Sequence, residues 1–275
     1  MLSWGVADFF AKKAVDRIGA VQALVINQAV ALGPILVYAI VAYSAPTFTA
    51  ELAFAASVTG ILGFLGYLYL YKGLKKGALS VVSPISASWF VITTLVASFL
   101  FKETLTSLQI LGVAMVFAGV FLASTNLAEF KRDIGKGKSN GVFEALVAMV
   151  AWGFAFAFIK PVIDQTSPIM ALLLARAAAF TVLFTWVGAN KTKIVIPTKL
   201  IFLFIVTAGL LDAFGYATYN VGVTTEFVSI ISPIAAAYPV VTILLARFFL
   251  KEQLAQTQKI GVTAILAGLV LMALV

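Results

Sequence analysis

The sequence contains no cysteine and no histidine, and only 11% of its residues are charged. Without cysteine, the chain can form no disulfide and offers no thiol nucleophile. Without either residue, it lacks the usual ligands of a zinc site and the base of a Ser-His-Asp triad. These absences exclude most soluble enzyme chemistries, and so few charges in 275 residues leave too little polar surface for a soluble domain.

Hydrophobic residues make up 62% of the chain, in successive apolar stretches of about twenty residues, which can cross a ~30 Å hydrocarbon layer as helices. They are apolar on all sides, whereas the strands of a membrane barrel alternate apolar and polar residues. We therefore predict an all-α polytopic membrane protein with ten transmembrane helices, rather than a soluble all-helical protein. The predicted helices cover residues 2–16, 19–43, 51–72, 77–100, 106–125, 141–163, 167–188, 199–221, 226–249 and 255–274.

One polar segment, NLAEFKRDIGKGKSN at residues 126–140, has the composition of a linker and is called the basic linker below. It separates residues 1–125 from residues 141–275, and each part contains five predicted helices. Its GKGKS sequence does not complete a phosphate-binding loop, because the position five residues before Gly137 is Arg132 instead of glycine. We predict a solvated loop and no prosthetic cofactor.

The two parts repeat one another. Residues 3–16 (SWGVADFFAKKAVD) and 151–164 (AWGFAFAFIKPVID) share six residues at an offset of 148. Residues 99–122 and 248–271 agree at ten of 24 positions, at an offset of 149. Because five is an odd number of crossings, the second copy runs through the membrane in the opposite direction. Inverted repeats with a site at their interface are typical of secondary transporters.

The distribution of positive charge predicts the orientation. Fifteen of the nineteen lysines and arginines fall in loops on one side of the predicted bundle. By the positive-inside rule these loops face the cytoplasm, which places both termini outside a cell membrane. The net charge of +8 is thus explained by topology, with membrane lipid as the surrounding partner, and predicts no nucleic-acid binding. The other four cations are Lys102, Lys160, Arg176 and Arg247.

Three repeated motifs carry a family resemblance. A Trp-Gly pair near the start of each half, a Ser-Pro pair in each fourth helix and a Lys-Glu-x-Leu sequence before each fifth helix resemble the EamA domains of the drug/metabolite transporter superfamily. The resemblance covers the whole chain, twice. It implies a ten-helix carrier with a central cavity between predicted helices 1, 3, 4, 6, 8 and 9. It also implies a small polar or amphipathic substrate, often an amino acid or another metabolite, which is usually exported.

Two features depart from that family. Many members keep both termini in the cytoplasm, whereas the charges here place them outside. Only three residues precede Trp4, whereas about eleven helical residues precede its repeat counterpart Trp152. The short first helix predicts either a native start upstream of Met1 or a helix that enters the bilayer incompletely.

Ionisable residues inside the predicted helices mark the candidate site, because a charge at bilayer depth costs roughly 2.5–3.5 kcal/mol or more. Arg176 and Asp212 lie at matching depths in helices 7 and 8. They predict either an ion pair that only neutralises itself, or an Arg176 anchor for a substrate carboxylate or phosphate with Asp212 as its counter-ion. Asp8, whose repeat counterpart is Phe156, is either a substrate contact or an acid balanced by Lys12 one turn away.

Aromatic and amide side chains complete the predicted cavity wall, although tyrosine near a helix end is also typical of an interfacial anchor and tryptophan of packing. Asn27 and Gln28 favour interhelical hydrogen bonds over substrate contact. No catalytic residue and no metal ligand is predicted. The predicted substrate-binding residues are Asp8, Tyr67, Trp89, Trp152, Arg176, Asp212, Tyr216, Tyr219, Asn220 and Tyr238.

The Ser-Pro pairs predict hinges. Pro84 and Pro233 lack an N–H group and release the carbonyls of Ser80 and Ser229 four residues earlier. The two kinks lie near opposite membrane faces, so they suit alternating access, with static kinks for packing as the alternative. The predicted hinge or gate residues are Ser80, Ser83, Pro84, Ser229, Ser232, Pro233 and Pro239.

These features together predict a secondary active transporter that exports amino acids or related small metabolites by alternating access, with protons as a candidate coupling ion. A lipophilic-cation or drug exporter is the alternative. Two acids in the cavity without Arg176 would favour it, whereas Arg176 favours an anionic group on the substrate. An intramembrane enzyme would need clustered acids or a nucleophile–base pair, and only Asp8 and Asp212 are acids well inside helices.

Overall fold

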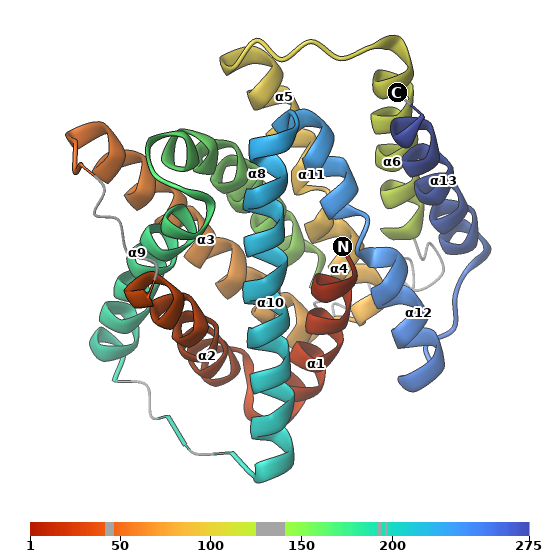
Figure 1. Cartoon of the computed structure of the whole chain (residues 1–275). Coiled ribbons are helices and arrows are strands. Elements are labelled where there is room, and N and C mark those ends of the chain that lie inside the picture. Colours follow the sequence, from red (N-terminus) through yellow and green to blue (C-terminus); the bar gives the residue numbers. More distant parts are fainter. Residues whose placement is uncertain (42–46, 125–140, 192–193, 196, 275) are drawn as a thin grey trace.

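The structure, a computed structural model, describes residues 1–41, 47–124, 141–191, 194–195 and 197–274. Within these residues it contains helices and no strands, and twelve helical segments form the ten predicted units of an all-α polytopic bundle (Figure 1). The basic linker lies outside the described residues. The helices are α1 (Leu2–Ile18), α2 (Ala20–Val41), α3 (Ala50–Lys76), α4 (Leu79–Ala87), α5 (Trp89–Leu100), α6 (Ser107–Ser124), α8 (Val142–Gln165), α9 (Pro168–Ala189), α10 (Lys199–Thr225), α11 (Val228–Ala236), α12 (Pro239–Phe249) and α13 (Gln256–Ala273).

The predicted fourth and ninth helices are present as spans Leu79–Leu100 and Val228–Phe249, and each is divided into two segments close to its predicted kink. The breaks, at Ser88 and at residues 237–238, occupy corresponding positions of the two repeats. The Ser88 N–H bonds to the Ile85 carbonyl three residues back (3.1 Å), which tightens and ends the last turn of α4. Pro239 is the first residue of α12, where its missing N–H is tolerated. The breaks therefore follow Pro84 and Pro233 by about one turn.

The bundle has apolar side chains outside and polar ones inside, as expected for a chain surrounded by lipid. Phe99 and Phe248 are 84% and 74% exposed, whereas Asn27 and Arg176 are 1% and 4% exposed. In the part of the chain that the structure describes, seven helical units are long and apolar enough to cross a membrane, and residues 107–123 and 256–272 form shorter apolar helices.

The two halves pack through equivalent helix pairs. α1 of the first half lies against α10 of the second, and α8, the repeat counterpart of α1, lies against α3 (Figure 1). In each of these contacts, a tryptophan ring packs directly against a glycine of the facing helix. A Cβ added at Gly66 would lie 2.3 Å from Nε1 of Trp152, and one at Gly215 would lie 2.5 Å from Nε1 of Trp4. No other residue fits at these two positions without moving an indole ring. At the bundle edge, α6 and α13 pack against each other through their paired glycines.

The Lys-Glu motif of the first half ties that half to the second. Lys102 has a left-handed backbone (φ 54°), and Glu103 follows it. The Glu103 carboxylate accepts hydrogen bonds from the N–H groups of Val228 (3.1 Å) and Ser229 (2.9 Å) and from the Ser229 hydroxyl (2.6 Å). These are the first residues of α11, where a helix leaves N–H groups unbonded and favours negative charge.

The second half makes the reciprocal contact. The Glu252 carboxylate accepts from the N–H groups of Leu79 (3.2 Å) and Ser80 (3.1 Å) at the start of α4. The Gln258 side-chain amide donates to the Ser80 carbonyl (3.1 Å), the group that Pro84 leaves without a partner. We call the Glu103 and Glu252 contacts the cross-repeat caps, because each half caps the Ser-Pro helix of the other.

Candidate functional site

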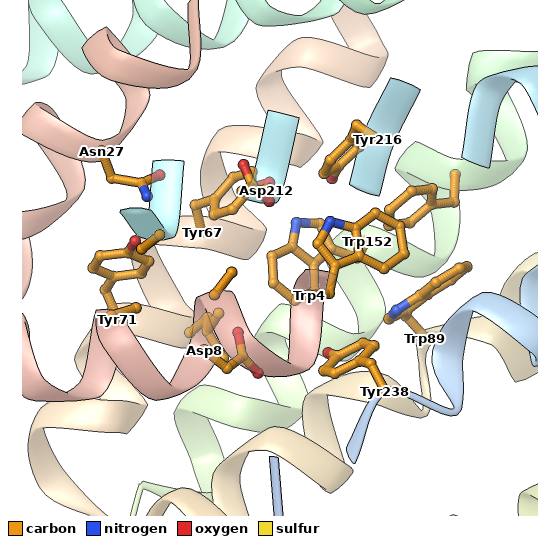
Figure 2. Close-up of a pocket in the computed structure, with 15 residues that line it drawn as sticks. Trp4, Asp8, Asn27, Tyr67, Tyr71, Trp89, Trp152, Asp212, Tyr216 and Tyr238 are labelled. Carbon is orange, nitrogen blue, oxygen red and sulfur yellow. Dashed lines mark hydrogen bonds between the residues drawn. The ribbon is translucent and has the colours of Figure 1, made fainter. Parts of the chain in front are cut away.

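A cavity lies where α1, α3, α8 and α10 meet near the breaks at Ser88 and residues 237–238; we call it the central cavity (Figure 2). Both repeats contribute to its lining. Seven of the ten predicted substrate-binding residues line it: Asp8, Tyr67, Trp89, Trp152, Asp212, Tyr216 and Tyr238.

Aromatic rings form most of the wall, and Trp4 lies at their centre. Its ring centroid is 5.2 Å from Tyr216, 5.6 Å from Phe156 and 6.0 Å from Tyr238, all in edge-to-face arrangements. Phe156 is stacked on Trp89 at 4.0 Å. Such contacts hold the rings in fixed orientations, so the cavity has a preformed aromatic surface.

Arg176 lies behind this wall and does not line the central cavity. Its guanidinium pairs with Asp212 (Nη2–Oδ2 2.5 Å), donates to the Tyr67 hydroxyl (3.0 Å) and donates to Gln28 (2.6 Å). The Tyr67 hydroxyl in turn donates to Asp212 (2.7 Å), and the guanidinium carbon lies 4.7 Å from the Tyr216 ring centroid. The five residues form the Arg176 cluster, in which Gln28 and Arg176 are repeat counterparts. The predicted ion pair is therefore present, and three side chains already occupy the guanidinium.

Asp8 is different, because no cation pairs with it in the part of the chain that the structure describes. It is 8% exposed and accepts a hydrogen bond from the Ser83 hydroxyl (2.6 Å). Lys12, the predicted balancing residue, instead pairs with Asp16 (2.9 Å) and donates to the Leu74 carbonyl (2.7 Å). The carboxylate of Asp8 thus enters the central cavity with only a hydroxyl partner.

Two predicted residues lie away from the cavity lining. The Tyr219 hydroxyl bonds with the Ser232 hydroxyl (3.0 Å), behind the Phe156 ring. The Asn220 amide donates to the Pro168 carbonyl (2.9 Å), which joins α10 to the start of α9. Neither side chain is among the residues that line the cavity.

The sequence-based prediction omits several lining residues, chiefly Trp4, Asn27, Tyr71 and Phe156. Signals for two of them were present: Trp4 is the repeat counterpart of Trp152, and Tyr71 follows Tyr67 by one helical turn. Among the described residues, no three Asp, Glu, His or Cys side chains gather as they would around a metal ion.

A second cavity, of about 400 Å³, lies on the other side of Tyr67, Phe156 and Tyr216. These three rings line both cavities and form a layer between them. The second cavity is almost entirely apolar, with Thr59 and Arg176 among its few polar lining residues.

Comparison with known proteins gives concordant matches. The chain matches the EamA-like transporter family over residues 1–125 and again over residues 139–274. It is 21% identical over 225 residues to an uncharacterized transporter of Archaeoglobus fulgidus, covering 82% of this chain and 77% of that protein. It is 32% identical over 123 residues to an uncharacterized protein of Methanocaldococcus jannaschii, covering 44% of this chain and 88% of that protein. A solved crystal structure has the same fold, with a TM-score of 0.73, 14% identity and coverage of 99% of this chain and 97% of that one.

Proposed function

Because the chain belongs to the EamA-like transporter family, we propose that it is a secondary active transporter that exports amino acids or related small metabolites by alternating access. The central cavity carries this proposal, because it is lined by residues from both inverted halves, where inverted-repeat carriers have their substrate site. The family membership points to a transporter rather than an enzyme.

The two cavities suggest a path. Leu70 and Tyr71 of the central cavity lie toward the end of α3 that the basic loop residues follow, and Thr59 and Gly60 of the second cavity lie toward its other end. With the basic loops in the cytoplasm, a substrate enters the central cavity from that side and leaves through the second cavity when the Tyr67–Phe156–Tyr216 layer opens.

The helix breaks supply a means of opening. α4 and α5 meet at Ser88, and α11 and α12 meet at residues 237–238, beside the cavity walls formed by Trp89 and Tyr238. Rotation at either break moves one of these walls with its half-helix. Protons are the proposed coupling ion, because the hydroxyl-bonded Asp8 carboxylate can take up either a proton or a substrate cation.

A lipophilic-cation exporter is the second candidate. Asp8 favours it, because this acid has no cationic partner among the described residues, while Arg176 is held by Asp212 (2.5 Å).

A ligand screen tests the proposal. Purified full-length protein is heated with amino acids, sugar phosphates or organic cations, because a ligand that binds only the folded state raises the melting temperature with its concentration. Trp89→Leu should remove the shift, since Trp89 lines the central cavity, whereas Trp186→Leu on α9 should retain it. Absence of any shift, or equal shifts in both variants, contradicts a substrate site in this cavity.

A further inference from the structure

The charges around the central cavity do not balance. Two acids line it, Asp8 and Asp212, and no basic side chain does. The charge of Asp212 is matched by Arg176 at 2.5 Å. Asp8 has only the Ser83 hydroxyl at 2.6 Å, since Lys12 is bonded to Asp16. The described lining therefore holds one carboxyl group without a cationic partner.

A buried carboxylate without a cationic partner is costly, because burial removes it from water and no opposite charge compensates. An unpaired charge inside a membrane protein is usually balanced by an opposite charge of the protein or by a substrate that carries the opposite charge. Asp8 faces the interior of the central cavity, where a bound molecule can supply the opposite charge.

The aromatic side chains near Asp8 are also suited to binding a positively charged group. Figure 2 shows the Asp8 carboxylate and the Tyr238 hydroxyl pointing toward one another, with Trp4 beside them. The Trp4 and Tyr238 ring centroids are 6.0 Å apart at an interplanar angle of 75°. The faces of such rings attract cations, tryptophan most strongly, and their carbon frameworks accept an apolar group.

An anion would meet the opposite conditions. A substrate carboxylate in the central cavity would face Asp8 and Asp212, and three of the five N–H groups of Arg176 already bond to Asp212, Tyr67 and Gln28. Arg176 also lies outside the lining of this cavity and contributes to the second one. A zwitterion would satisfy Asp8 but would bring a second unpaired charge into the cavity.

We infer that the central cavity binds small organic cations, an ammonium group attached to an aromatic or aliphatic body, with Asp8 as the counter-ion. The inference rests on the proposed carrier function. It narrows the proposed substrates from amino acids and related metabolites to amines that carry no free carboxylate. Asp8 is a specificity-determining residue, and the Arg176 cluster is a fixed support behind the site.

Four compounds with one phenyl ring test the charge alone: 2-phenylethylamine, phenylalanine, 2-phenylethanol and 3-phenylpropionate. Binding to the purified full chain is measured by calorimetry at neutral pH. The amine should bind at least about tenfold more tightly than each of the others. Asp8→Asn should abolish this preference, and Asp8→Glu should keep it. Glu226→Gln, which changes an exposed acid that does not line the cavity, should leave it unchanged.

Each result has a definite meaning once monodispersity shows that the variants fold. Tighter binding of the acid or the zwitterion, or an amine affinity unchanged by Asp8→Asn, overturns the inference while the carrier function stands. If the amine does not bind while the protein carries another solute across proteoliposome membranes, the inference fails and the carrier function stands. If no solute of any charge is carried, the proposed function itself fails.

Discussion

The cross-repeat caps should contribute measurably to stability, and unequally. Glu103 is 8% exposed and accepts three hydrogen bonds, from two N–H groups at 3.1 and 2.9 Å and the Ser229 hydroxyl at 2.6 Å. Glu252 accepts two, at 3.2 and 3.1 Å. Glutamine has nearly the same shape but carries no charge, and one of its two oxygens is replaced by an amide donor that faces the N–H groups of the helix start.

The expected loss follows from these contacts. A buried hydrogen bond to a charged group is worth roughly 1.5–3 kcal/mol, and the charge at a partly buried helix N-terminus adds up to about 2 kcal/mol. We expect Glu103→Gln to lower the free energy of unfolding by about 2–4 kcal/mol and Glu252→Gln by about 1–2 kcal/mol. In a chain of this size the first change corresponds to a melting temperature about 5–10 °C lower.

The assay is thermal unfolding in one detergent, followed by intrinsic fluorescence. Glu226→Gln is the matched control, because Glu226 lies one residue before the N-cap of α11 but is exposed. It should change the melting temperature by less than about 1 °C, and the double variant Glu103→Gln/Glu252→Gln should be nearly additive, since the caps share no residue. A Glu103→Gln melting temperature equal to that of the control would refute the capping argument.

Three further predictions follow from other contacts. Gly66→Ala should unfold or strongly destabilise the protein, because its Cβ would lie 2.3 Å from the Trp152 ring, whereas Gly63→Ala, with no atom within 4 Å, should melt as the wild type does. Arg176→Gln should destabilise the fold by about 3–5 kcal/mol by leaving the Asp212 charge unpaired, and adding Asp212→Asn should restore most of the melting temperature; no recovery would contradict the neutralising pair. In this cysteine-free chain, Phe48→Cys should react with impermeant thiol reagents in intact cells and a cysteine in the basic linker should not, and the reverse pattern would overturn the orientation.

Much of the fold could be predicted from the sequence because its strongest signals are local or repeated. Apolar length locates the helices, and the offset between the Trp-Gly pairs reveals the duplication. Depth alone pairs Arg176 with Asp212, and the structure places them 2.5 Å apart.

The remaining features depend on contacts between distant segments. Pro84 indicates a bend in the fourth helix, but the C-cap at which α4 ends, Ser88, lies one turn further on and is not a proline. Lys12 seemed placed to balance Asp8 by spacing along the helix, but the fold offers it Asp16 and a carbonyl of α3. The Lys-Glu motif is plain in the sequence, yet the helix that Glu103 caps begins 125 residues later.

The protein is proposed to carry its substrate by alternating access. The most direct measurement is counterflow in proteoliposomes, with the tightest-binding compound of the phenyl series labelled outside and unlabelled inside. We predict saturable uptake that is accelerated by the unlabelled compound on the opposite side, and that is lost in Trp89→Leu but kept in Trp186→Leu. Uptake that does not saturate, is not accelerated, or is the same in empty liposomes would contradict the account.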